Sequence, residues 1–270
     1  MNEYKIDMHG GEHAVLLIHG LTGSPFEMKY LARELNRAGF TVKGPCLAGH
    51  GKTLGDLKRT RWQDWYRTVC ESFRELKRSH TKVSVAGLCM GALLALKLSV
   101  DFEEEVSSVS LISTTLFYDG WGLPWYKFLL PLAYLAPFCY LYSFKERDPY
   151  GIKNETLRTR VVEGMRDGSI AHESVPGVSM RELYRFIDVM KKKIIARVTT
   201  PTLIIHSKED DLASAKNALY VLKHIKSKDV RMLLLDDCYH MVPIDNQRRI
   251  AADEIIHFFK GESCGTSNSS

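Results

Sequence analysis

A cysteine lies between two glycines in residues 87–91, Gly-Leu-Cys-Met-Gly, which have the pattern G-x-C-x-G. Residues 82–86 before it, Lys-Val-Ser-Val-Ala, predict a strand, and the Leu- and Ala-rich residues 90–100 after it predict a helix. Glycines on both sides allow a tight strand-to-helix turn, and the helix N-terminus favours a thiolate there. With serine in the central position, this pattern is typical of a nucleophile elbow. We therefore predict that Cys89 is a nucleophile and not a buried structural thiol.

A nucleophile on such an elbow needs a base, and an acid that orients the base, in the chain order nucleophile, acid, base. His240 lies in a loop between a predicted strand, 230–235, and a predicted helix, so it is the predicted base. Three carboxylates follow the predicted strand 202–206, near the edge of the sheet where ligands bind in such folds. They compete for the role of the acid: Glu209, Asp210 and Asp211.

The segment His19-Gly20-Leu21-Thr22-Gly23 follows the first buried strand of the sequence. Its position fits the loop that donates one N–H group to an oxyanion. We predict that this donor is the backbone of Leu21, and that the backbone of Met90, directly after the nucleophile, is the second. His19 is predicted to form structural hydrogen bonds and not to act as a base.

Strands and helices alternate in the two parts of the chain that position these residues. The predicted strands are 14–18, 40–42, 82–86, 106–113, 202–206 and 230–235. The predicted helices are 25–38, 62–77, 90–100, 213–224 and 246–260. This alternation predicts an α/β fold with a mostly parallel central sheet flanked by helices.

Residues 116–197 interrupt this alternation, so we predict a cap inserted into a core made of 1–115 and 198–260. The last ten residues, 261–270, are small and polar and are predicted to be disordered. In the later part of the insertion, 155–193, charged and apolar residues alternate, which predicts one or two surface helices.

The first part of the insertion, 121–144, holds nine aromatic residues and one charged residue. Such a segment predicts an apolar cap over a substrate pocket. The residues expected to contact substrate are Trp121, Trp125, Phe128 and Phe138. A cap that also touches a lipid surface is an alternative, whereas three prolines argue against a membrane-spanning helix.

The composition narrows the function classes further. The chain has 37 Lys and Arg and 32 Asp and Glu, a net charge of +5 without a basic stripe, which argues against nucleic-acid binding. Six widely spaced cysteines without a C-x-x-C pair predict neither a zinc site nor a disulfide scaffold. Residues 1–11 lack the apolar core of a secretory signal, so we predict free thiols in the cytoplasm.

Together these segments resemble the α/β-hydrolase superfamily, and more narrowly the small bacterial carboxylesterases that are similar to monoacylglycerol lipases. The matching residues are 15–24, 47–51, 62–65, 85–91, 201–211 and 239–240. The resemblance implies a triad of Cys89, Asp210 and His240, an oxyanion hole at Leu21 and Met90, and no metal or organic cofactor. The chain departs from this family at Cys89, where most members have serine.

The expected activity is hydrolysis of a small-molecule carboxylic ester or thioester with a hydrophobic acyl chain, through a covalent thioacyl-enzyme. An acyltransferase with the same cysteine nucleophile is one alternative, because a thioester can pass its acyl group to an acceptor other than water. A non-catalytic ligand-binding protein of the same fold is the other.

Overall fold

The structure is a computed structural model that describes residues 4–123, 138–166 and 174–261. Its centre is a seven-stranded sheet with the strand order β1-β3-β2-β4-β5-β8-β9. The strands are β1 (Ile6–Met8), β2 (His13–Ile18), β3 (Thr41–Gly44), β4 (Lys82–Leu88), β5 (Val106–Ile112), β8 (Thr202–Ser207) and β9 (Val230–Leu235). All neighbours run parallel except β1, which pairs antiparallel with β3. This sheet confirms the predicted fold class.

Strands of a parallel sheet are apolar on both faces, because helices cover both faces. In β2, Val15 and Leu17 point into one core while Leu16 and Ile18 point into the other, and all four are at most 1% exposed. The bounds of the six predicted strands agree with the structure to within two residues at each end. The sequence does not predict β1, a short edge strand of three residues.

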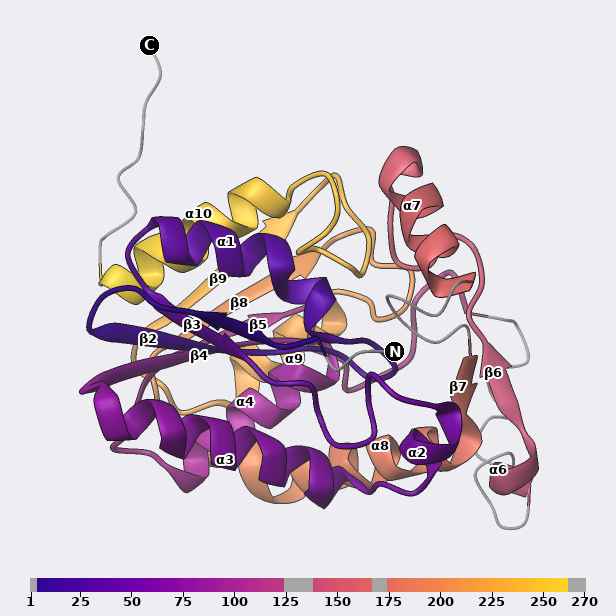
Figure 1. Ribbon diagram of the computed structural model, residues 1–270, viewed down its shortest axis with the longest axis horizontal. Coiled ribbons are helices and arrows are strands. Elements are labelled where there is room, and N and C mark those ends of the chain that lie inside the picture. Colours follow the sequence, from indigo (N-terminus) through magenta and orange to yellow (C-terminus); the bar gives the residue numbers. More distant parts are fainter. Residues whose placement is uncertain (1–3, 124–137, 167–173, 262–270) are drawn as a thin grey trace.

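Helices form a layer on each face of the sheet (Figure 1). The helical segments of this core are η1 (Pro25–Met28), α1 (Lys29–Arg37), α2 (Leu54–Lys58), α3 (Trp62–Ser79), α4 (Met90–Asp101), α9 (Lys216–His224) and α10 (Arg248–Lys260). Helices α1 and α10 lie on one face, and α3 and α4 lie on the other. The short helix α2, which begins with a capping box at Thr53, is also absent from the sequence prediction.

The segment between β5 and β8 has its described residues 138–166 and 174–176 at one end of the sheet, and its later residues lie along the face that α3 and α4 cover (Figure 1). Its described elements are α6 (Phe138–Leu141), β6 (Ser143–Lys145), α7 (Glu155–Arg166), β7 (Ser174–Pro176), α8 (Gly177–Val189), η3 (Met190–Ile194) and η4 (Ile195–Arg197). Strands β6 and β7 pair antiparallel, in a small sheet that the sequence does not predict. None of the described helices is long and apolar enough to cross a membrane.

Helix α8 has one buried face and one exposed face. Leu183, Phe186 and Ile187 are at most 3% exposed, and the ring of Phe186 stacks on Trp62 of α3 at 4.9 Å between centroids. The charged side chains of Arg185 and Asp188 are exposed. This amphipathic pattern is typical of a helix at the surface of a globular protein, as the sequence predicts.

Candidate active site

Cys89 lies at the turn between β4 and α4, with a backbone φ of 56° and ψ of −113°. A positive φ at a non-glycine residue is strained and is often found at functional sites. A Cβ at Gly87 would lie 2.2 Å from the Gly91 carbonyl oxygen, and a Cβ at Gly91 would lie 2.2 Å from the Ile18 carbonyl oxygen. The two glycines of the motif are thus required by close backbone contacts that hold the turn.

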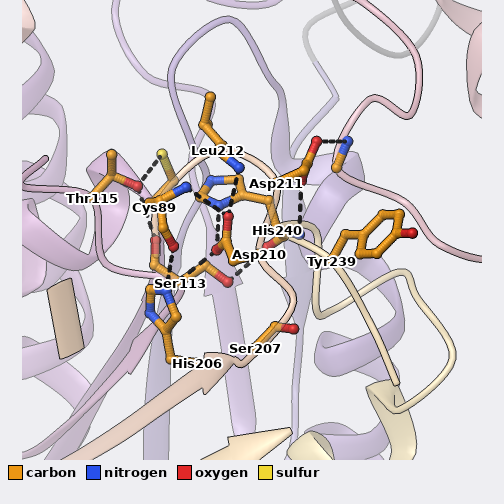
Figure 2. A network of polar contacts seen from close by, with 12 residues as sticks. Cys89, Ser113, Thr115, His206, Ser207, Asp210, Asp211, Leu212, Tyr239 and His240 are labelled. Carbon is orange, nitrogen blue, oxygen red and sulfur yellow. Dashed lines mark hydrogen bonds and ion pairs between the residues drawn. The ribbon is translucent and has the colours of Figure 1, made fainter. Parts of the chain in front are cut away.

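The Cys89 side chain is 7% exposed and its Sγ lies 3.4 Å from Oγ1 of Thr115. Thr115 donates its own hydroxyl proton to the Ser113 carbonyl at 3.1 Å, so its oxygen is available to accept the thiol proton (Figure 2). In this arrangement the Cys89 thiol is the donor.

His240 and Asp210 form a buried pair beside this cysteine (Figure 2). The imidazole Nδ1 lies 2.8 Å from Oδ2 of Asp210. The other carboxylate oxygen, Oδ1, accepts the backbone N–H groups of Leu212 at 2.9 Å and Ala213 at 2.7 Å. With Asp210 accepting at Nδ1, the opposite ring nitrogen, Nε2, is buried without a hydrogen-bond partner in the described part of the chain.

The pair is electrostatically coupled. Burial by itself lowers the pKa of His240, but the Asp210 carboxylate and the Cys89 thiol raise it well above its ordinary value. Burial by itself raises the pKa of Asp210, but His240 and His206 lower it below its ordinary value. The site therefore stabilises an ionised Asp210 next to an imidazole that readily takes up a proton.

The two other candidate acids have different positions. Glu209 is exposed at the surface, where it forms an ion pair with Lys153 at 2.5 Å. Asp211 accepts the backbone N–H of His240 at 3.4 Å and that of Gly151 at 3.2 Å, so it contacts the main chain and not the imidazole ring.

The loop that carries His240 is held by further hydrogen bonds from side chains. Ser113 Oγ donates to the His240 carbonyl at 2.7 Å. Asp245, which is fully buried, accepts the backbone N–H of Tyr239 at 2.8 Å and those of Lys153 and Asn154 at 2.8 and 2.9 Å. The sequence analysis missed Asp245, because nothing in the pattern separates it from the exposed carboxylates nearby.

Cys89 and His240 both line a cavity of about 270 Å³. Leu21 lies in its wall, and Met90 is the first residue of α4 and is fully buried. Apolar side chains from both the core and the segment between β5 and β8 complete the wall, including Tyr118, Leu123, Tyr142, Phe144, Met180 and Ile244.

Trp121 lies outside this wall, contrary to the expectation from the sequence. It is 60% exposed, donates its indole N–H to the Glu209 carbonyl at 3.0 Å, and contacts the Tyr239 ring at 5.3 Å between centroids. The indole contacts a backbone carbonyl group and an aromatic ring at the surface. The number of aromatic residues in the segment does not predict these contacts. The side chains of Trp125, Phe128 and Phe138 lie outside the described residues.

His19 is buried and forms two hydrogen bonds, as predicted. Its Nδ1 lies 2.8 Å from the Gly20 carbonyl, and its Nε2 accepts the Leu47 backbone N–H at 3.1 Å. A carbonyl can only accept, so the proton is on Nδ1 and the ring is neutral. Burial lowers the pKa of His19 to about 4, which agrees with this assignment.

Two glutamates that the sequence analysis missed, Glu27 and Glu146, also line the cavity. Glu27 lies near the start of the predicted helix 25–38, and Glu146 lies in the insertion 116–197. No local pattern indicates that either side chain points inward. Within the described residues, no group of three or more His, Cys, Asp or Glu side chains is arranged to hold a metal ion.

Comparison with known sequences identifies related proteins over most of the chain. The model of the family described as serine aminopeptidase, S33, matches residues 11–247. A thermostable monoacylglycerol lipase from Bacillus sp. (strain H-257) is 28% identical over 259 residues, covering 92% of this chain and 91% of the lipase. A carboxylesterase from Bacillus subtilis (strain 168) is 21% identical over 259 residues, covering 93% of this chain and 94% of the esterase.

Solved structures show the same fold. A structure reported for the metagenome-derived lipolytic enzymes LipS and LipT superimposes with a TM-score of 0.84 at 25% identity, covering 96% of this chain and 98% of that chain. A monoacylglycerol lipase from Paleococcus ferrophilus superimposes with a TM-score of 0.79 at 19% identity, covering 97% of this chain and 100% of that chain. The architecture is therefore the α/β-hydrolase fold.

Proposed function

Because the chain belongs to the serine aminopeptidase, S33, family of α/β-hydrolases, we propose that it hydrolyses carboxylic esters or thioesters of hydrophobic acids. The observation that carries this proposal is the position of Cys89 on a strained elbow, in the same cavity as the His240–Asp210 pair. The relatives named as a monoacylglycerol lipase and a carboxylesterase support an ester substrate. We further propose that Cys89 is the nucleophile, in the position where most members of the family have serine.

In the first half of the reaction, His240 Nε2 takes the thiol proton of Cys89, and the sulfur attacks the carbonyl carbon of the substrate. The C=O bond becomes a C–O⁻ single bond in the tetrahedral intermediate. His240 then gives its proton to the departing oxygen or sulfur as the bond to the leaving group breaks. The products of this half are an alcohol or thiol and a thioester on Cys89.

Two backbone N–H groups stabilise the negative oxygen in this proposal, those of Leu21 and Met90. Met90 is the first residue of α4, so the helix dipole adds a partial positive charge at this point. Leu21 lies in the wall of the cavity that holds Cys89, which is where such a donor is needed.

In the second half, His240 removes a proton from water, and the resulting hydroxide attacks the thioester carbonyl. Collapse of the second tetrahedral intermediate breaks the C–S bond, and His240 returns the proton to the sulfur. Asp210 holds the imidazole in one tautomer through Nδ1 and stabilises its charged form in both halves.

We propose that residues 116–197 form a cap and that the acyl chain lies beneath it, in the apolar part of the cavity. Tyr118, Phe144 and Met180 belong to this segment and line the cavity. They replace Trp121 in the proposal, since Trp121 lies at the surface. Burial of acyl methylene groups against these side chains would supply the binding energy.

A panel of p-nitrophenyl esters and acyl thioesters of graded chain length tests the proposal. We expect turnover in water without an added acceptor, and a mass increase equal to the acyl group on the peptide that contains Cys89. Turnover only with an added alcohol, amine or thiol would assign an acyltransferase instead. Saturable binding without any acyl-Cys89 would assign a binding protein and reject the catalytic proposal.

A further inference from the structure

The loop Gly20–Gly23, which carries the proposed oxyanion donor, contacts a buried carboxyl group. Oε2 of Glu27, in η1, accepts the Gly20 backbone N–H at 3.0 Å, and the Glu27 side chain is 7% exposed. A Cβ added to Gly23 would lie 1.8 Å from Oε1 of Glu27. The carboxyl group therefore fills the space that a side chain at position 23 would need.

Glu27 is also close to the proposed nucleophile. A Cβ added to Gly20 would lie 3.5 Å from Cβ of Cys89 and 3.6 Å from Oε2 of Glu27. Gly20 thus lies between the two side chains, and any charge on Glu27 acts directly on the chemistry at Cys89.

A second carboxyl group reaches the same loop from the other side. Oγ1 of Thr22 lies 2.5 Å from the Leu21 carbonyl oxygen and 3.1 Å from Oε1 of Glu146, which directly follows β6. A hydroxyl group has one proton, and a carbonyl oxygen can only accept. When Thr22 donates to Leu21, its contact with Glu146 is a hydrogen bond only if the carboxyl group of Glu146 carries a proton.

The charged groups that act on Glu27 are Glu146 and His240, and those that act on Glu146 are His240 and Asp211. Other titratable side chains also line the cavity: Cys89, Tyr118, Tyr142, Asp148 and Tyr150. Lys145 and Arg147 also belong to the cavity wall, but their side chains are exposed at its rim.

Burial and the neighbouring acid therefore favour the neutral forms. Burial, with a smaller contribution from Glu146, raises the pKa of Glu27 to about 8. Burial, with a smaller contribution from Asp211, raises the pKa of Glu146 to about 7. Both carboxyl groups are mostly protonated below pH 7, and both become charged as the pH rises through 8.

We propose that Glu27 and Glu146 are positioning residues that clamp the Gly20–Gly23 loop from two sides, and that this carboxyl clamp supports acylation of Cys89 only while both groups carry a proton. This inference rests on the proposed function, because the proposed function makes the loop a donor to the oxyanion. Ionisation of Glu27 places a negative charge next to the developing oxyanion. Ionisation of Glu146 makes it compete with the Leu21 carbonyl for the single proton of Thr22.

The test compares two reactions of Cys89 between pH 6 and 9.5. Acylation by a p-nitrophenyl ester under single-turnover conditions requires the oxyanion site, whereas alkylation by iodoacetamide does not. One pH unit above a pKa of about 8, only about one tenth of Glu27 is protonated. Glu146 is protonated to a still smaller extent at this pH, so we expect acylation of the wild-type protein to fall more than tenfold from its maximum by pH 9, while alkylation does not fall.

Glu27→Gln/Glu146→Gln removes both ionisations, so we expect its acylation rate to level off above pH 8, whereas Glu27→Gln alone should keep the smaller fall caused by Glu146. Glu34→Gln is the matched control, because Glu34 is paired with Arg37 on the surface of α1, away from the cavity. It should keep the wild-type profile. The clamp is rejected if the double variant shows the same alkaline fall as the wild type, or if alkylation falls in parallel with acylation.

A spectroscopic measurement keeps the clamp testable if no ester acylates Cys89 at any pH. The amide ¹H–¹⁵N signals of Gly20 and Leu21 should shift between pH 7 and 8 in the wild-type protein, and not in Glu27→Gln/Glu146→Gln. Signals that do not respond to pH in the wild type would overturn the clamp, whatever the fate of the proposed function. If the double variant does not fold, the loss of one of the two titration steps in Glu27→Gln or in Glu146→Gln serves for the same comparison.

Discussion

Nε2 of His206 lies 3.4 Å from Oδ2 of Asp210, the same carboxylate oxygen that contacts the His240 ring at 2.8 Å. The His206 Nε2 also lies 2.7 Å from the Ala213 carbonyl, so this nitrogen carries the ring proton. The ring is fully buried, and burial lowers the pKa of His206. Asp210 therefore lies between two imidazole rings, one of which stays neutral and holds the carboxylate in place.

Replacing His206 tests this arrangement. We expect His206→Leu to lower kcat/KM by about two- to twelvefold, which corresponds to the ~0.5–1.5 kcal/mol of a typical hydrogen bond. The acid limb of the pH–rate profile should also move, because Asp210 sets the pKa of His240. His206→Gln keeps an N–H donor at a similar reach and should restore most of the loss. Equal losses in both variants, with no change in the pH profile, would indicate a packing role alone.

Cys89→Ala should abolish turnover while the protein still folds, because a smaller side chain is easily accommodated on the elbow. Loss of a triad nucleophile typically costs on the order of a million-fold in turnover. Cys89→Ser restores the residue usual in such enzymes, but we expect only weak activity, since the cavity is shaped around a larger sulfur atom. Cys46→Ala, at a cysteine outside the cavity wall, is the control. Full activity of Cys89→Ala would reject the nucleophile assignment.

The elbow could be predicted because its strand, its two glycines and its helix are contiguous in residues 82–100. The close contact of Gly87 with Gly91 lies within that turn, whereas the close contact of Gly91 is with Ile18 of β2 and appears only in the folded sheet. The loop position of His240 is predictable for the same reason. The choice of Asp210 over Glu209 and Asp211 came only from the family resemblance, because three consecutive carboxylates differ only in the direction in which the folded loop points them.

The carboxyl clamp could not be predicted because it depends on distant parts of the chain. Thr22 and Glu146 are 124 residues apart in sequence and meet only when the segment after β6 packs on the core. Glu27 looks like an ordinary acidic residue in the first turn of a helix, which favours acids for electrostatic reasons. Its burial against Gly20 and Gly23 appears only in the tertiary structure.

The stability of the protein should depend on Glu27 in a defined pH range. Its pKa is raised from 4.5 to about 8 in the folded state. A raised carboxyl pKa means that the folded state holds the proton more tightly, so stability falls as the pH rises from about 4.5 through about 8. The free energy of unfolding, measured by urea denaturation, should fall less between pH 6 and pH 8.5 for Glu27→Gln than for the wild type. For Glu34→Gln it should fall as much as for the wild type.

Asp245 should matter for stability because it accepts backbone N–H groups from the Lys153 segment and from the His240 loop. Asp245→Asn replaces one carboxylate oxygen by an NH2 group, which cannot accept, so the backbone N–H groups that this oxygen bound lose their partner. We expect a loss of about 1–3 kcal/mol in the free energy of unfolding. Asp253→Asn, at an exposed position on α10, is the matched control and should change little. Equal stability of the two variants would contradict the anchoring role.

The last prediction concerns the acyl chain. If the chain binds against Tyr118, Phe144 and Met180, each added methylene buries apolar surface worth up to ~0.8 kcal/mol. Catalytic efficiency should then rise about three- to fourfold per methylene until the cavity is full, and fall for longer chains. Phe144→Ala should flatten this rise for long chains and have little effect on acetyl esters. Trp121→Ala removes an aromatic ring outside the cavity wall and should keep the wild-type slope. If efficiency instead falls steadily from acetyl upward, and the protein binds liposomes, the apolar residues of the proposed cap contact a lipid surface and do not enclose an acyl chain.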